Sequence, residues 1–117
     1  MRITLQAPIT QNTIKERSAF TVTSKFYSDS ADPWTLTAPT TAKYRIDCLS
    51  TGYPVRDWTS LTPATSISVP ISSSDNQIFD DTKRRERRLL TVKADDGLST
   101  QYQETYDWNV INLPWQY

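Results

Sequence analysis

Short runs in which apolar and polar residues alternate constrain this chain more than any other feature. A period of two fits an extended strand with one buried face, and it does not fit a helix. The clearest run is Thr41–Cys48, in which every second side chain is apolar, and the same alternation recurs over Phe20–Phe26, Ser66–Ile71 and Leu90–Ala94. Together with weaker runs elsewhere, the sequence predicts about seven short antiparallel strands and no substantial helix.

The residues on the inward side of these runs form the expected core. They are Phe20, Val22, Ser24, Phe26, Ala42, Tyr44, Ile46, Cys48, Ile67, Val69, Ile71, Leu90, Val92 and Ala94, and Trp58 is expected to join them. Ile3, Leu5 and Ala7 alternate with polar neighbours, and Val55, Trp58 and Leu61 indicate a short irregular strand. Tyr102, Tyr106, Trp108 and Val110 share one face of the last strand. Glu104 is the exception, because it shares a face with Tyr102 and Tyr106. It points an acid toward the core or an interface, unless a bulge reverses the alternation there.

The composition agrees with a sheet protein. Thr and Ser make up a quarter of the 117 residues, whereas Ala, Leu, Met and Glu, which favour helices, are scarce. Turn residues separate the runs at Ser50–Gly52 and Asp95–Gly97, and Ser74 or Asp75 is expected to cap a helical turn that ends by Phe79. We therefore expect residues 1–117 to form one all-β domain, a β-sandwich.

The residue types that are missing exclude most enzyme chemistry. Histidine is absent and Cys48 is the only cysteine, so the chain has no Ser-His or Cys-His nucleophile and no imidazole or thiolate cage for a metal. Nothing in the sequence brings any two of Glu16, Glu86 and Glu104 together for glycoside hydrolysis. The turn aspartates lack the spacing of a calcium loop. The sequence predicts a protein that is not an enzyme and has no catalytic residue, metal site or cofactor.

The charge balance restricts the partners. Thirteen Lys and Arg residues offset thirteen Asp and Glu residues, whereas proteins that coat nucleic acids or bind membrane surfaces carry excess positive charge. No apolar stretch is long enough to span a bilayer, and Met1–Gln6 lacks the apolar region of a secretory signal. We expect a small soluble protein with Cys48 buried in its core, folded in a reducing cytoplasm.

Several of these segments resemble parts of immunoglobulin-like and fibronectin-III-like modules. Thr41–Asp47, Asp57–Leu61 and Ser68–Ile71 resemble their middle strands, and Leu90–Thr100 resembles their last hairpin, in which a V-x-A-x-D-G-x-S pattern is common. The chain departs from antibody-type domains because it lacks their cysteine pair. The resemblance implies a single Ig-like β-sandwich of about seven strands.

A cysteine-poor module of this size also resembles, in type, the Ig-like domains of tailed-bacteriophage particles. That resemblance implies a virion structural protein, made in the host cytoplasm, that serves as a capsid decoration or cement protein on the assembled shell. Its implied partners are the major capsid protein or other virion subunits, with self-association in the particle. The alternative is a tail or adhesion module that binds host-surface carbohydrate or another tail protein.

The main charge cluster, Lys83–Arg88, supplies one set of candidate partner-binding residues. Arg84, Arg85, Arg87 and Arg88 suit contacts with an acidic neighbouring subunit, because the guanidinium group pairs with carboxylates through two hydrogen bonds. The competing interpretation is a solvated edge whose charge is offset by nearby aspartates. That interpretation is favoured over nucleic-acid binding by the zero net charge.

Three aromatic residues outside the predicted strands supply the other set. Trp34 follows Pro33 in a predicted loop, and Trp115 and Tyr117 lie in the segment 111–117, which we expect to be a docking tail. Large aromatic side chains are enriched at the centres of protein interfaces. The alternative is that these side chains fold back and cap the open ends of the sandwich.

Overall fold

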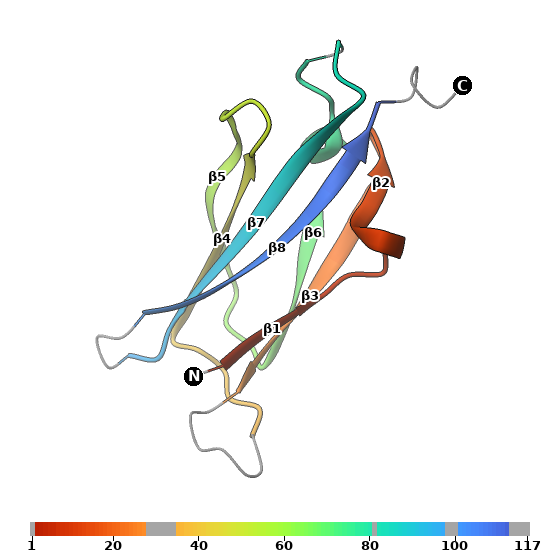
Figure 1. Cartoon of the computed structure of the whole chain (residues 1–117). Coiled ribbons are helices and arrows are strands. Elements are labelled where there is room, and N and C mark those ends of the chain that lie inside the picture. Colours follow the sequence, from red (N-terminus) through yellow and green to blue (C-terminus); the bar gives the residue numbers. More distant parts are fainter. Residues whose placement is uncertain (1, 28–34, 81, 98–100, 113–117) are drawn as a thin grey trace.

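Two β-sheets pack face to face in the computed structural model, which describes residues 2–27, 35–80, 82–97 and 101–112 (Figure 1). The three-stranded sheet has the order β1-β3-β6, with β1 (Arg2–Gln6), β3 (Phe20–Tyr27) and β6 (Ser66–Ile71). The five-stranded sheet has the order β2-β8-β7-β4-β5, with β2 (Thr13–Lys15), β8 (Gln101–Ile111), β7 (Arg85–Asp95), β4 (Thr41–Cys48) and β5 (Pro54–Leu61). The predicted all-β sandwich is confirmed.

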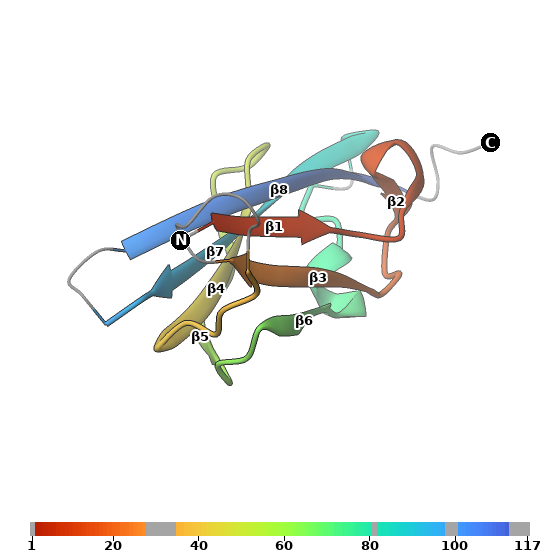
Figure 2. The ribbon, with the colours of Figure 1, turned by 90° about the horizontal axis from the view of Figure 1, so that it is seen from below.

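The two layers are separated clearly when the molecule is viewed from below (Figure 2). Helical structure in the described residues consists of two short 3₁₀ turns, Thr10–Asn12 and Ser73–Asn76. None of the helices in those residues has the length and apolarity needed to cross a membrane. The molecule is elongated along its strands, with a longest dimension of 49 Å.

The alternation in the sequence builds the core between the sheets. In β4 every second residue is buried, and β6 and β7 follow the same rule. The buried apolar residues are Ile3, Val22, Phe26, Ala42, Tyr44, Ile46, Ile67, Val69, Ile71, Leu90, Val92, Ala94, Trp108 and Val110. Those in β3, β4, β6 and β7 were expected to face inward, and Trp108 and Val110 were expected to share one face of the last strand.

The longest element is the hairpin of β7 and β8, which pair in continuous antiparallel register from Arg85 opposite Ile111 to Asp95 opposite Gln101. Gly97 follows β7 with a φ of 86°, a backbone conformation that residues other than glycine rarely adopt. A Cβ atom at this position would lie 2.9 Å from Thr40 Oγ1, so any other residue would also require the Thr40 side chain to move.

Trp58 is not part of the core, contrary to the expectation for this aromatic residue. Leu61 and Thr59 lie opposite the buried Ala42 and Tyr44, so alternation along β5 places the half-buried Trp58 on the outer face of the sheet. There the indole ring lies 5.0 Å from Lys43 Nζ and 4.7 Å from Lys93 Nζ, two residues that are direct cross-strand neighbours. The odd spacing between Trp58 and the partly buried Leu61 puts the two side chains on opposite faces of the strand.

The N-terminal part of the chain contributes to both sheets. β1 pairs with β3, and after the first 3₁₀ turn β2 pairs in parallel with the last three residues of β8. The described residues therefore leave Gln101–Trp108 of β8 with a strand partner on one side only, which is β7. β1 lies alongside this open edge in both views (Figures 1 and 2).

Candidate protein-interaction surface

The predicted arginine cluster is divided by the alternation of β7. Arg85 and Arg87 point outward, whereas Glu86 and Arg88 are fully buried on the inner side of the strand. Arg84 precedes the strand and is exposed. The prediction of Arg88 as a partner-binding residue is therefore wrong. Side chains alternate between the two faces along the whole strand, so a charged residue at an inward position is buried like the apolar residues that follow it.

Glu86 and Arg88 form an ion pair inside the sandwich, with 3.0 Å between Oε1 and Nη1. Arg88 also donates hydrogen bonds to the carbonyl oxygens of Asp75, at 3.2 Å, and Gln77, at 2.5 Å. Its Nη1 lies 3.0 Å from the sulfur of Cys48. Cys48 is buried as predicted, but its surroundings are polar at this end. A buried charged pair persists in a protein only when such additional hydrogen bonds satisfy its remaining atoms.

Glu86 fixes the segment that leads into β7. Its Oε1 accepts a hydrogen bond from the backbone N–H of Phe79, at 2.9 Å, and its Oε2 accepts one from Asp80, at 2.8 Å. With Arg88 holding the carbonyl of Gln77, the buried pair binds residues 77–80 at three backbone positions. This segment is therefore held by buried side chains in addition to turn hydrogen bonds such as that from the Lys83 N–H to the carbonyl of Asp80.

The 3₁₀ turn before this segment is also held by hydrogen bonds and an ion pair of buried side chains. Ser72, and not Ser74 or Asp75, caps the 3₁₀ turn, and it forms a capping box with Asp75. Asp75 is buried and pairs with Arg56, at 3.1 Å, which raises the pKa of the Arg56 guanidinium through that hydrogen bond. Asn76 accepts from the indole N–H of Trp108, at 2.7 Å, and donates to the carbonyl of Ser18, at 2.6 Å.

This scaffold presents three exposed apolar side chains, which we call the aromatic tip: Leu49, Tyr53 and Phe79. Tyr53 and Phe79 make an edge-to-face contact with 6.3 Å between ring centroids, and they are 64% and 46% exposed. The guanidinium carbon of Arg88 lies 5.0 Å from the centre of the Phe79 ring. The loop between β4 and β5 supplies Leu49 and Tyr53, which places all three near one end of the sandwich.

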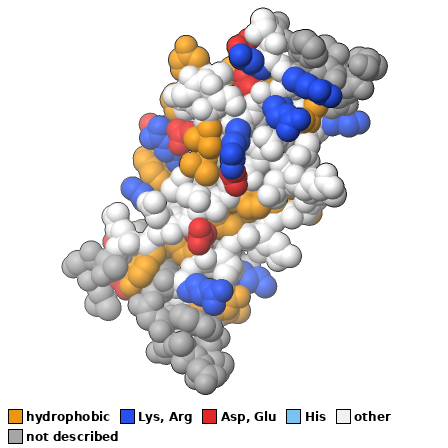
Figure 3. Space-filling model, viewed as in Figure 1, with side chains coloured by type: hydrophobic (Ala, Val, Ile, Leu, Met, Phe, Trp, Pro, Cys, Tyr) orange, Lys and Arg blue, Asp and Glu red, His pale blue; other side chains and the backbone are white. Residues whose placement is uncertain are grey.

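Basic side chains lie beside the aromatic tip. Lys83, Arg84 and Arg85 are exposed and form no ion pair with any described residue, whereas Arg87 pairs with Asp107 on β8. On the face shown in Figure 3, Lys and Arg side chains gather near the start of β7. The hydroxyl and N–H of Thr82, together with the nearby Lys83 charge, lower the pKa of the exposed Asp80.

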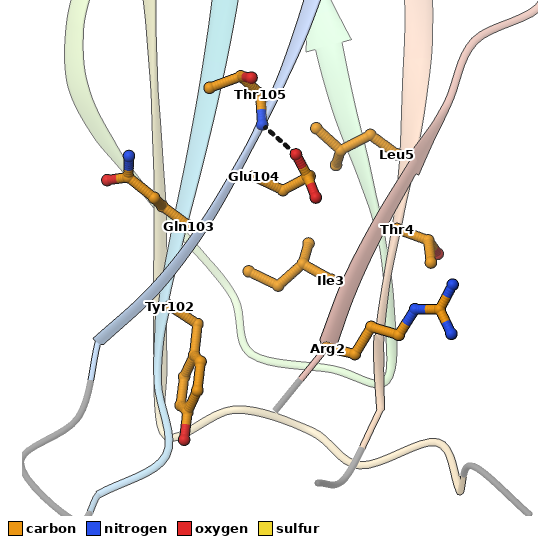
Figure 4. Close-up of a pocket in the computed structure, with 8 residues that line it drawn as sticks. All are labelled: Arg2, Ile3, Thr4, Leu5, Tyr102, Gln103, Glu104 and Thr105. Atoms are coloured by element: carbon orange, nitrogen blue, oxygen red, sulfur yellow. Dashed lines mark hydrogen bonds between the residues drawn. The ribbon is translucent and has the colours of Figure 1, made fainter. Parts of the chain in front are cut away.

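A second candidate site is a groove between β1 and β8, with a volume of about 550 Å³ (Figure 4). Ile3 and Leu5 line it from β1, and Tyr102 and Glu104 line it from β8. Glu104 lies on the inward side of β8 as predicted, with no bulge, and it is exposed because the groove opens there. Among the described residues that line the groove, Glu104 is the one carboxylate, and no second acid is paired with it as in a glycosidase.

Of the other predicted partner-binding residues, some are exposed and some lie outside the described part of the chain. Arg84, Arg85 and Arg87 are exposed at the end that carries the aromatic tip. Trp34, Trp115 and Tyr117 lie outside the described residues, as does the segment 113–117 of the predicted docking tail. Among the described residues, no group of three or more metal-ligating side chains converges.

Sequence reasoning missed the aromatic tip and the buried role of Glu86. The tip residues lie in loops, where the sequence carries no periodic signal. Glu86 had a usable signal, because the even-numbered inward residues of β7 continue backward from Leu90 through Arg88 to Glu86.

Comparisons of the chain with protein-family models, with curated proteins and with solved structures found no match. The candidate site is therefore interpreted from its own geometry.

Proposed function

We propose that this protein is a non-enzymatic structural module that docks on the surface of another protein through the aromatic tip. The observation that carries the proposal is the exposed Tyr53–Phe79 pair, held in place by the buried Glu86–Arg88 pair. Tyr, Phe and Arg are typical of the residues that dominate binding energy at protein interfaces.

The rigidity of the loop supports a binding role. A side chain that is already ordered in the free protein loses little conformational entropy when a partner covers it. The backbone N–H groups of Phe79 and Asp80 are both bound by a carboxylate that is itself buried. This arrangement pre-organises the exposed ring of Phe79 for contact.

The charges beside the tip indicate an acidic partner surface. Lys83, Arg84 and Arg85 have no acidic partner among the described residues, so they are available to carboxylates on a second protein. Exposed charges of this kind increase the association rate and are weakened by salt. We expect binding to weaken as ionic strength rises.

For the assembly that carries this partner, we propose the virion of a tailed bacteriophage, with the protein as a decoration or cement protein on the capsid shell. Support comes from the type resemblance of a small, cysteine-poor β-sandwich to the Ig-like domains of those particles. The major capsid protein or another virion subunit then provides the acidic surface. On a repeated lattice, several weak contacts combine into stable attachment.

The test combines two measurements. Mass spectrometry of intact particles gives the copy number, and sedimentation of the recombinant protein with purified shells gives binding. We expect hundreds of copies per particle and co-sedimentation that weakens with salt. A dozen copies or fewer would move the protein to the tail or neck, and absence from the particle would contradict a structural role in the virion.

Matched variants test the tip itself. Phe79→Ala and Tyr53→Ala should each weaken shell binding by about thirtyfold, the effect of a hot-spot residue. Leu36→Ala is the control, because Leu36 is also 46% exposed but lies next to the end of β3, away from the tip. Equal effects of all three substitutions would show that the tip is not the docking surface.

A further inference from the structure

We infer that the open edge of β8 accepts an extended segment of another polypeptide, which carries a basic residue opposite Glu104. This site is separate from the aromatic tip: the groove lies near the end where β7 and β8 are connected, and the tip lies toward the opposite end (Figure 1). The inference does not depend on the proposed docking function.

Backbone geometry determines which groups of β8 face the open edge. The N–H of Asn112 bonds to the carbonyl of Arg84, at 2.9 Å, so even-numbered residues of β8 direct their backbone groups toward β7. Odd-numbered residues direct theirs to the other side, as the bond from Glu16 N–H to the carbonyl of Ile111 shows. The backbone groups of Gln101, Gln103, Thr105 and Asp107 therefore point to the open edge.

One of these groups already has a substitute partner. The backbone N–H of Thr105 donates to Glu104 Oε1, at 3.0 Å, so a side chain occupies the position that a neighbouring strand would take (Figure 4). An incoming strand would supply a carbonyl to this N–H and release the Glu104 carboxylate. Addition of a strand to a sheet edge is a common mode of peptide recognition, in which backbone hydrogen bonds supply the affinity.

Side chains along the groove define the chemistry of the incoming segment. A residue paired opposite Glu104 shares its face, so its side chain enters the groove beside the carboxylate. Arg2 also lines the groove, but in Figure 4 its side chain points away from Glu104. A Lys or Arg opposite Glu104 therefore neutralises the carboxylate, and small β-branched residues two positions away reach Tyr102 and the apolar wall of Ile3 and Leu5. The preferred segment is therefore short and extended, with one central cation.

A second copy of this chain is a poor occupant. Two-fold antiparallel pairing over the whole free edge, Gln101–Asp107, places Glu104 directly opposite Glu104 of the other copy. Like charges in directly opposed positions destabilise a strand pair. The same acid that favours a basic segment therefore discourages edge-to-edge dimers, which is a common protection of exposed strand edges.

The test uses the acetylated, amidated heptapeptide Thr-Val-Thr-Lys-Thr-Val-Thr and its analogue with Glu in the centre. We expect the Lys peptide to bind about threefold more tightly than the Glu peptide, and to slow amide hydrogen exchange at Gln103 and Thr105. No binding of either peptide at millimolar concentration, or protection elsewhere in the protein, would overturn the inference.

Two variants separate backbone pairing from charge. Thr105→Pro removes an N–H that β7 does not use, so it should reduce Lys-peptide binding at least tenfold while the protein stays folded by circular dichroism. Glu104→Lys should reverse the preference between the peptides. Asp57→Lys on β5, the opposite edge of the same sheet, should leave it unchanged. If Thr105→Pro unfolds the protein, the exchange data on the parent chain still decide the question.

The last test asks whether a second copy of the chain binds the open edge of β8. Sedimentation of the parent protein without peptide should show no dimer that protects Gln103 and Thr105. A dimer with that protection would assign the edge to a second copy and overturn the inference.

Discussion

The two halves of this sandwich differ in how their buried polar groups are hydrogen-bonded. In the half that carries the aromatic tip, Glu86, Arg88, Asn76 and Asp75 are buried and each has hydrogen-bond partners. In the half that carries the groove, Ser24 is buried and its hydroxyl has no partner among the described residues. The same two sheets therefore enclose a satisfied polar network at one end and a largely apolar interior at the other.

This difference shows how one fold can combine a fixed surface with an adaptable one. Backbone segments bound by buried charges resist movement, because each opening exposes an uncompensated charge. An open strand edge has no such restraint and can exchange one hydrogen-bond partner for another. We therefore expect substitutions to have larger effects in the tip half than in the groove half.

The largest effect is expected for Glu86→Gln, which leaves Arg88 buried without its counter-charge. The free energy of unfolding should fall by about 3–5 kcal/mol, measured by urea denaturation. Arg45→Gln is the control. Arg45 pairs with Asp47 and both side chains are partly exposed, so this substitution should lower the free energy of unfolding by less than about 1 kcal/mol. Equal costs would mean that the buried pair does not organise the tip half.

A smaller effect, of opposite sign in the two halves, is expected for two polar-to-alanine substitutions. Ser24→Ala removes a buried hydroxyl without a partner and should leave stability unchanged or raise it by up to about 1 kcal/mol. Asn76→Ala removes the partner of the Trp108 indole and should lower stability by about 1–3 kcal/mol. Thermal and urea unfolding of both variants measure the contrast, and a clear loss for Ser24→Ala would contradict it.

The smallest effect concerns the pH dependence of the tip. Hydrogen bonds from Thr82 lower the pKa of Asp80 in the folded protein, so their contribution is present above the unfolded pKa and is lost as pH falls through the folded value. Thr82→Ala should raise the Asp80 pKa toward its ordinary value. An NMR titration of the Asp80 carboxyl carbon gives the result directly, and an unchanged pKa would show that the Thr82 hydroxyl has no such role, since the variant keeps the Thr82 backbone N–H.

The alternation in the sequence predicted most of the fold, because strand faces are decided locally. The faces of β3, β4, β6 and β7 follow from it, and the turn at Gly97 follows from the separate turn signal Asp95–Gly97. The expectation for Trp58 was wrong, because it relied on the size of the aromatic side chain, whereas alternation from the inward-facing Leu61 places Trp58 on the outer face.

The candidate site was predicted less completely. Arg84, Arg85 and Arg87 were placed on the surface correctly, whereas charge alone misplaced Arg88. Strand alternation would have placed it inside, but a buried arginine needs partners from distant segments, such as the carbonyl of Gln77, that a sequence does not identify. The exposure of Tyr53 and Phe79 likewise depends on loops packed across different strands.

The N-terminal strands also have a mechanical consequence. Along the chain, β1 leaves one sheet and β2 joins the last strand of the other, in parallel with it. Tension applied between the start of β1 and the end of β8 would pull β2 and β8 in opposite directions along their length. Their hydrogen bonds would then be loaded in shear and would break together rather than one after another. Once β1 had separated from β3, a module that occupied a strained lattice would resist extension at this short parallel pairing.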